Sequence, residues 1–431
     1  MQLAQIAVNS VEIVYAGQLG PTYLAAATVG SHTFHAAFLF LMGLAIAVAP
    51  LVSQARGRGA FREVRRTVRQ GLWAVTALSL PPMILLWYIQ PIMLALGQAP
   101  AVAAAAEDFT RPLTLGLPAW VWYFVLRNFA AAMGRPRPGL YAMLSGVVIN
   151  AVAGYMLVFG NWGAPDLGIT GAGIAATLAA WVVFLVMLAF VFIDPKLKRM
   201  RLFARFWRPD WELFKEINRV GLPIGTALFF ETLLFLAALY LQGLISIASQ
   251  AAHGAAIMII AITFMLPMGV AQAGTVRIGL AVGRRDRSAA GRAAVITFAL
   301  GLGCTVFTAL LLLSVPTTLV GIFLVESQPD AAQVLQLGVA FLAVGALFQL
   351  VDGGQAIAMG CLRGLRDTTK PMLIAGFCYM GIGLPLSALL GFETDLAGVG
   401  IWIGLAVGLA AAAVLLTWRF YRLWSTWAFQ R

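Results

Sequence analysis

Long runs of hydrophobic residues alternate with short polar segments along all 431 residues of the chain. Each run is too long for a β-strand, and only helices or closed barrels satisfy the backbone in lipid. The alternating ten-residue pattern of barrel strands is absent, so the runs predict membrane-spanning helices, which need about 20 apolar residues each. We count twelve spans, at residues 1–17, 23–53, 68–93, 108–133, 139–160, 170–193, 217–242, 251–282, 291–324, 332–360, 371–391 and 398–424.

The composition supports an all-α polytopic membrane protein rather than a soluble domain. Hydrophobic residues make up 61% of the chain and charged residues 11%, whereas a soluble domain is about half apolar and a quarter charged. The formal net charge of +12 is compatible with nucleic-acid binding. Because the basic residues lie in short loops between apolar runs, we interpret them instead as topology signals and contacts for lipid headgroups.

The loops divide by charge into two alternating sets, and this division predicts the orientation of the protein. Basic residues gather at 56–66, 135–137, 196–219, 284–292, 363–370 and in the tail from Arg419, and Arg111 is the exception that lies away from this set. The other loops hold mainly acids. The positive-inside rule places the basic loops in the cytoplasm, so we expect both termini to be cytoplasmic, as the even number of spans requires.

The longest basic connection, residues 194–216, predicts a boundary between two lobes of six helices. Its mixture of bases and aromatic residues is typical of an amphipathic segment at the membrane interface, and a plain linker is the alternative. Similar sequences recur on its two sides at offsets of about 226 to 233 residues, namely 55–68 with 281–295, 126–138 with 357–371, and 167–181 with 396–410. Repeated lobes around a central site are usual in secondary transporters. We predict an N-terminal lobe at 1–193, a linker at 194–216 and a C-terminal lobe at 217–431.

Three carboxylates lie inside the predicted spans and away from their ends: Glu12, Glu231 and Asp352. A charged group at a helix centre costs about 2.5–3.5 kcal/mol on insertion scales, so each acid needs a wet cavity, a proton or a bound cation. We find no Lys or Arg deep in a span to pair with them. Glu231 is therefore the central candidate for a cation or proton site, and the structural alternative is a protonated acid that bonds a neighbouring helix.

Other polar residues extend these candidate sites. Asp352 is followed by Gly353 and Gly354, which we expect to loosen the helix and free carbonyl oxygens as ligands. Glu12 and Asn150 form the candidate first-lobe site for proton or substrate coupling, although a lone intramembrane Asn often only joins two helices. The candidate cavity-lining residues are Phe230, Phe264 and Gln349, while aromatics at helical spacing are more often packing.

The sequence contains no phosphate-binding loop and no HExxH or GxSxG pattern. His32 and His35 can share a helix face, but two histidines without a third ligand make a weak metal site. We therefore predict no catalytic residues, no metal centre and no cofactor. An ion gradient, rather than ATP hydrolysis in this chain, is the expected driving force.

Seven stretches spread nearly end to end carry a family resemblance. They are VEIVYAGQLG (11–20), PLVSQARGRG (50–59), FGNWGAPDLGITGAGIAAT (159–177), GLPIGTALFFETLLF (221–235), AAHGAA (251–256), FMLPMGVAQAGTVRIG (264–279) and VDGGQAIAMGCLRGLRDT (351–368). Together they resemble the multidrug and toxic compound extrusion (MATE) family, in its NorM-like bacterial branch. The resemblance implies two six-helix lobes and export of lipophilic organic cations across the bacterial inner membrane in exchange for Na⁺ or H⁺. It also implies that Glu231 and Asp352 form the cation site, and that Glu12 and Asn150 belong to the first-lobe pocket.

This sequence departs from the family pattern in the first lobe. The acid of helix 1 is usually Asp and is Glu12 here, and Gly154 stands where a second Asn often follows Asn150. The first span is also short and has no basic lead-in. We expect either that the first half of helix 1 is absent from this sequence or that its start lies upstream.

Three other functions remain as alternatives. A MATE-related flippase for lipid-linked or polysaccharide intermediates tends to have a basic central cavity, and the lack of deep bases favours cationic cargo instead. An integral-membrane enzyme such as a prenyl transferase needs Asp-rich metal motifs, which are missing. A passive channel would show no coupling to Na⁺ or pH.

We expect organic cations, Na⁺ or H⁺ and membrane lipids as partners, no nucleic acid, and a monomer.

Overall fold

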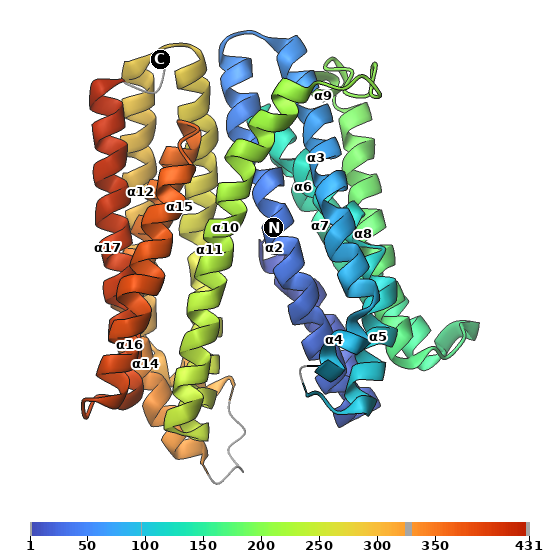
Figure 1. Cartoon of the computed structure of the whole chain (residues 1–431), viewed down its shortest axis with the longest axis vertical. Coiled ribbons are helices and arrows are strands. Elements are labelled where there is room, and N and C mark those ends of the chain that lie inside the picture. Colours follow the sequence, from blue (N-terminus) through green and yellow to red (C-terminus); the bar gives the residue numbers. More distant parts are fainter. Residues whose placement is uncertain (1, 96, 324–329, 428–431) are drawn as a thin grey trace. The chain divides into compact units, whose positions relative to one another are not determined.

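The computed structural model describes residues 2–95, 97–323 and 330–427, and side chains from residue 11 onward. Throughout these residues the chain is helical and has no β-strand, which confirms the all-α fold class (Figure 1). Ten of the described segments are long and apolar enough to cross a membrane. The two other predicted spans, 1–17 and 108–133, correspond to α1 and to the pair α5 and α6.

The helices form two compact units, which meet in sequence between Gly225 and Thr226. The first unit contains α1 (Gln2–Leu19), α2 (Pro21–Gly57), α3 (Phe61–Trp87), α4 (Ile89–Ala95), α5 (Pro100–Thr114), α6 (Leu117–Ala132), α7 (Arg137–Phe159), η1 (Asn161–Gly163), α8 (Gly168–Ile193) and α9 (Pro195–Lys198). Helix α10 (Trp211–Ile245) begins in the first unit and ends in the second. The second unit continues with α11 (Ile247–Gly283), α12 (Arg287–Ser314), α13 (Pro316–Gly321), α14 (Ala331–Gly364), α15 (Thr369–Gly376), η2 (Phe377–Gly383), α16 (Leu384–Phe392) and α17 (Ala397–Thr426).

Local chemistry explains where single predicted spans divide into two helices. Val315 adopts φ −136° and ψ 44° immediately before Pro316, which opens α13. The residue before a proline is disfavoured in the α-helical region, so α12 ends there. Helices α5 and α6 meet at Leu115 and Gly116, just before Pro118 in the first turn of α6. Hydropathy alone does not register such breaks, because the apolar run continues through them.

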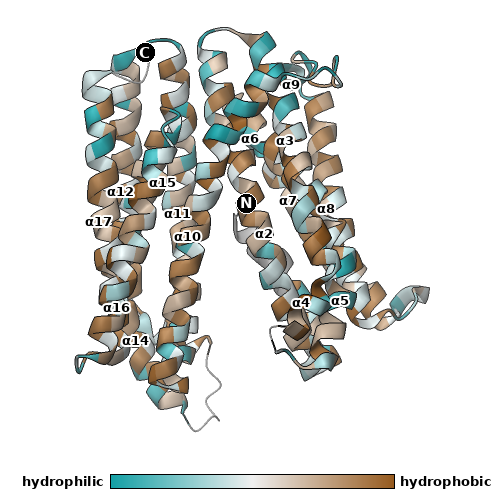
Figure 2. Ribbon diagram, viewed as in Figure 1, coloured by the Kyte–Doolittle hydropathy of each residue, from teal (hydrophilic) through white to brown (hydrophobic). Residues whose placement is uncertain are grey.

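Hydrophobic residues occupy most of the length of the helices, as the brown colour in Figure 2 shows, and polar residues gather toward helix ends. In the first unit, α7 packs on α8, and α2 packs on α3, α5 and α6. In the second unit, α14 is central and packs on α11, α12 and α17. This central position places residues of α14 in contact with three neighbouring helices.

Glycines permit the close approach of helices in the second unit. On α17, a Cβ at Gly404 would lie 2.3 Å from the backbone nitrogen of Ser387, and one at Gly408 would lie 2.6 Å from Cα of Gly383. On α14, a Cβ at Gly353 would lie 2.0 Å from Cγ2 of Thr305. The expectation that Gly353 and Gly354 loosen α14 is wrong, because the helix runs unbroken from Ala331 to Gly364. Gly353 serves packing instead, since close helix contact needs a residue without a side chain.

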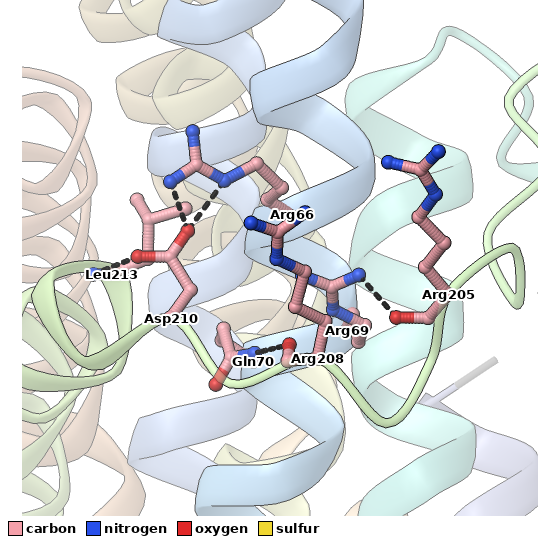
Figure 3. Close-up of polar contacts among 7 residues, drawn as sticks. All are labelled: Arg66, Arg69, Gln70, Arg205, Arg208, Asp210 and Leu213. Atoms are coloured by element: carbon pink, nitrogen blue, oxygen red, sulfur yellow. Dashed lines mark hydrogen bonds and ion pairs between the residues drawn. The ribbon is translucent and has the colours of Figure 1, made fainter.

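The segment between α8 and α10 is anchored to the first unit by its apolar side chains and by polar contacts with α3 (Figure 3). Leu197 and Leu202 are buried in the core of that unit. Asp210 forms an ion pair with Arg66 and accepts a hydrogen bond from the backbone N–H of Leu213 at 3.3 Å, so it caps α10. Arg69 Nη1 donates to the carbonyl of Arg205 at 2.6 Å. The predicted lobe boundaries at 193 and 217 stay predictions.

Candidate functional site

The two acids of the second unit lie close enough to interact. Glu231 on α10 is half-buried, whereas Asp352 on α14 is 3% exposed. The two carboxyl groups act on each other electrostatically. Two like charges in a medium of low dielectric repel strongly. The pair is therefore suited to hold a proton or a positively charged guest.

Two buried amide side chains lie about one turn on either side of Asp352 along α14. Gln349, Asp352 and Gln355 follow each other at intervals of three residues on α14, and all three are buried. Among the residues that the structure describes, none donates a hydrogen bond to Gln349 Oε1, Asp352 Oδ1 or Gln355 Oε1. The amide nitrogen of Gln349 donates to Thr308 Oγ1 at 3.3 Å, which orients that side chain. Buried oxygens without donors cost free energy, and a cation or a bound proton would satisfy them.

A further polar group comes from Tyr379, which sequence analysis did not single out. Tyr379 is 1% exposed, and its hydroxyl has no hydrogen-bond partner within the described part of the chain. The Tyr379 side chain interacts electrostatically with Glu231, Asp352 and Arg363. It lies in η2, a π-helical turn, and π-turns inside helices are frequent at functional sites.

Packing around η2 brings this turn to α10. A Cβ on Gly376 would lie 2.8 Å from the Phe230 ring, so the chain just before η2 touches α10 beside Glu231. On its other side, η2 packs on the glycine face of α17 through Gly383 and Gly408. The available sequence signal was the run of glycines at 376, 381 and 383, which marks close backbone approach but does not identify Tyr379 as polar and buried.

Two arginines, Arg363 and Arg127, lie in surroundings that the sequence analysis did not predict. Arg363, in the last turn of α14, interacts electrostatically with both Glu231 and Tyr379. Its Nε atom is buried, and no described residue accepts a hydrogen bond from it. In the first unit, Arg127 on α6 is 6% exposed, with its guanidinium carbon 4.6 Å from the centroid of the Phe124 ring. Arg127 is thus buried within the first unit, and the prediction that no Arg lies deep in a span stays a prediction. The sequence analysis also overlooked that Arg363, at the end of α14, interacts with Glu231.

The predicted cavity-lining residues occupy different surroundings. Phe264 on α11 is buried at 8% exposure, and Gln349 has no exposed surface. Phe230 is half-buried and packs against Gly376. Their role as the lining of a substrate cavity stays a prediction.

The first unit holds the second predicted site. Glu12 on α1 is 6% exposed and Asn150 on α7 is 1% exposed, and their side chains are hydrogen-bonded. The missing second Asn has a local explanation in the neighbouring Tyr15. A Cβ at Gly154 would lie 2.5 Å from Cε2 of Tyr15, whose hydroxyl donates to the carbonyl of Ala151 at 2.9 Å. The Tyr15 ring thus fills the space that a side chain at residue 154 would occupy.

Metal ligands do not cluster in the part of the chain that the structure describes. No group of three or more His, Cys, Asp or Glu residues there is arranged to hold a metal ion. A cation at Glu231 and Asp352 would therefore need amide, hydroxyl or water oxygens to complete its coordination. Such hard oxygen ligands suit an alkali cation better than a transition metal.

Comparison with known protein families gives a clear result. The MatE family profile matches residues 1–156 and 223–389, which together make up more than half of the chain. The two matched segments fall on either side of the basic connection at residues 194–216.

Curated relatives and solved structures agree with this match. The chain is 43% identical to the "Probable multidrug resistance protein NorM" of Brucella suis biovar 1, over 97% of this chain and 90% of the relative. It is 42% identical to the protein of the same description from Rhizobium meliloti, over 98% and 90%. Its fold resembles that of "MATE in the straight conformation", with a TM-score of 0.88, 19% identity, and coverage of 98% of this chain and 93% of that one. The eukaryotic MATE transporter AtDTX14 gives a TM-score of 0.83 at 20% identity, over 98% and 94%.

Proposed function

Because this chain belongs to the MatE family of multidrug and toxic compound extrusion transporters, it is a transporter rather than an enzyme, and we propose that it exports organic cations in exchange for Na⁺ or H⁺. The names of its relatives, which describe multidrug resistance proteins, support drug efflux. They do not favour the alternative of a flippase for lipid-linked or polysaccharide intermediates.

One observation carries the proposed coupling mechanism. Asp352 is 3% exposed beside Glu231, and its Oδ1 has no donor within the described chain. An unpaired buried carboxylate is costly, so a cationic guest gains free energy from the site. If the coupling ion and the organic cation both use this charge, they compete. Competition becomes exchange when each guest has a different affinity for the outward- and inward-facing states.

Transport in membrane vesicles tests this proposal. We expect Asp352→Asn to reduce ethidium efflux at least tenfold, with Na⁺ and pH gradients imposed separately to identify the coupling ion. Asp330→Asn is the matched control, because Asp330 is exposed at the start of the same helix and its side chain makes no capping hydrogen bond. Undiminished efflux by Asp352→Asn, at equal protein level, would remove this acid from the mechanism. Efflux that responds to neither gradient would favour a passive channel.

We assign the Glu12 and Asn150 pair to proton or substrate coupling in the first unit. Their hydrogen bond places an ionisable group within a buried surface, where loss of a proton creates a site for a cationic substrate. Glu12→Gln keeps the hydrogen bond and removes titration, so we expect it to lower pH-driven efflux. If efflux by this variant keeps the wild-type pH dependence, Glu12 is structural.

The basic face of the segment before α10 is the proposed contact with membrane lipids. Its apolar residues Leu197 and Leu202 are buried, whereas its bases are exposed, namely Lys196, Lys198, Arg199, Arg201, Arg205 and Arg208. We propose that this face and both termini are cytoplasmic in the bacterial inner membrane and contact anionic headgroups. Single cysteines at residues 199 and 393 test the orientation. Each is labelled from the outer side and from the inner side of the membrane, and the side from which it reacts gives its location. Light scattering of the purified protein tests the proposed monomer.

A further inference from the structure

The acid pair of the second unit has a positively charged neighbour that lies on the same helix as Asp352. Arg363 interacts electrostatically with Glu231 and with Tyr379, and its buried Nε has no acceptor among the described residues. Tyr379 in turn interacts with both acids. Four groups from α10, α14 and η2 therefore share one electrostatic environment.

Counting charge in this environment gives an unexpected result. Glu231 and Asp352 carry two negative charges when neither is protonated, and the guanidinium of Arg363 keeps its positive charge in proteins. The net charge of the group is then −1, and one proton or one monovalent cation brings it to zero. Without Arg363 the net charge would be −2, and neutrality would need two monovalent guests or one divalent guest.

We propose that Arg363 fixes the valence of the site, so that the acid pair takes one monovalent cation at a time and discriminates against dications. This inference rests on the proposed function and adds a class of substrate to it. Arg363 acts as a positioning residue: it needs no contact with the guest, because its charge acts across the shared low-dielectric surroundings. It also keeps the guest from binding too tightly to leave, a requirement of every transport site.

The side chains around Arg363 support a role in the site rather than in helix packing alone. A base at a helix end usually extends its side chain to water and headgroups. Arg363 instead has a buried Nε and acts on groups of the polar cluster. Nearby Arg419 is different, because it forms a salt bridge to Asp367 at 2.5 Å and its charge is already matched.

A pair of dyes that share one ring system provides the test. Ethidium and propidium contain the same phenanthridinium ring with its single positive charge. Propidium carries a second positive charge on an ammonium group in its side chain. We expect the purified protein in lipid nanodiscs to bind ethidium more tightly than propidium. In Arg363→Gln the ratio of the two dissociation constants should shift toward propidium by about tenfold, which corresponds to about 1.4 kcal/mol. Arg363→Lys keeps the charge and should keep the wild-type ratio.

Further variants separate a charge effect from a structural one. Glu231→Gln combined with Arg363→Gln restores a net charge of −1, so its ratio should return toward wild type. Lys370→Gln removes an exposed base after α14 and should leave the ratio unchanged. The proposal is overturned if folded Arg363→Gln keeps the wild-type ratio, or if the double variant does not reverse the shift. A failure of the proposed function itself would give a different result. In that case neither Glu231→Gln nor Asp352→Asn would change the binding of ethidium.

Discussion

Asp210 has two roles that a pair of substitutions separates. Its carboxylate forms an ion pair with Arg66 and caps α10 through the backbone N–H of Leu213 (Figure 3). Asn is as good a helix cap as Asp, so Asp210→Asn removes the charge and keeps the cap. Asp210→Ala removes both.

The structure sets the size of each effect. The Arg66 side chain is 49% exposed and that of Asp210 is 7% exposed, so solvent screens the pair, and we assign it about 0.2–1 kcal/mol. The cap contributes about 0.5–2 kcal/mol. Asp210→Asn should therefore weaken the attachment of the segment by at most about 1 kcal/mol, and Asp210→Ala by about 1–3 kcal/mol.

Limited trypsin digestion measures this attachment. The exposed base Arg205 precedes Asp210, and tryptic cleavage after it requires the segment to leave α3. When the detached segment returns to α3 faster than trypsin cleaves it, the cleavage rate follows the population of the detached state. We expect cleavage to rise by at most about fivefold in Asp210→Asn and by about 5- to 100-fold in Asp210→Ala, since 1.4 kcal/mol is a factor of ten.

A matched control exists on another helix. Asp286 caps α12 by accepting from the N–H of Ala289 at 2.8 Å and lies far along the chain from this segment. Asp286→Ala should leave cleavage after Arg205 unchanged. The reasoning is refuted if Asp210→Asn is cleaved as fast as Asp210→Ala, because the charge would then outweigh the cap, or if neither variant differs from wild type.

Two glycines yield further predictions. Gly154→Asn introduces the second Asn of the family pattern but places its Cβ 2.5 Å from the Tyr15 ring. Overpacking of this kind costs about 1–3 kcal/mol, so the thermal unfolding midpoint of this variant should fall. Adding Tyr15→Leu should recover the midpoint. Gly404→Leu brings Cβ 2.3 Å from the Ser387 backbone and should sharply lower the yield of monodisperse protein in size-exclusion chromatography. Gly303→Leu on α12 meets open space, so an equal loss of yield there would contradict the packing argument.

The helices were predictable from the sequence because hydropathy over about 20 residues decides whether a segment can cross a bilayer. Boundaries depended on local chemistry that hydropathy does not register, such as Val315 before Pro316 at the end of α12. The effect of Gly353 was also beyond the sequence. Glycine weakens an isolated helix, but packing against Thr305 decides its role here.

The acids of the candidate sites were predictable for a different reason. A carboxylate within an apolar span is rare and costly, so Glu12, Glu231 and Asp352 stand out without any structural knowledge. Their grouping was not predictable from the residues alone. The electrostatic pair Glu231 and Asp352 joins two helices about 120 residues apart, and only the resemblance to a family connected them before the fold was known.

Arg363 and Tyr379 were missed for one shared physical reason: sequence gives the position of a Cα along a helix but not the direction of a long side chain. Arg363 ends α14 and was counted among the loop bases, yet its side chain acts on Glu231. Tyr379 lies among apolar residues of the sequence, in a π-helical turn that packs against α17. Both residues add polar groups to a site whose acids were already evident. The sequence therefore locates the negative charges of this site, whereas the fold determines its net charge, and the net charge decides which cations the site can bind.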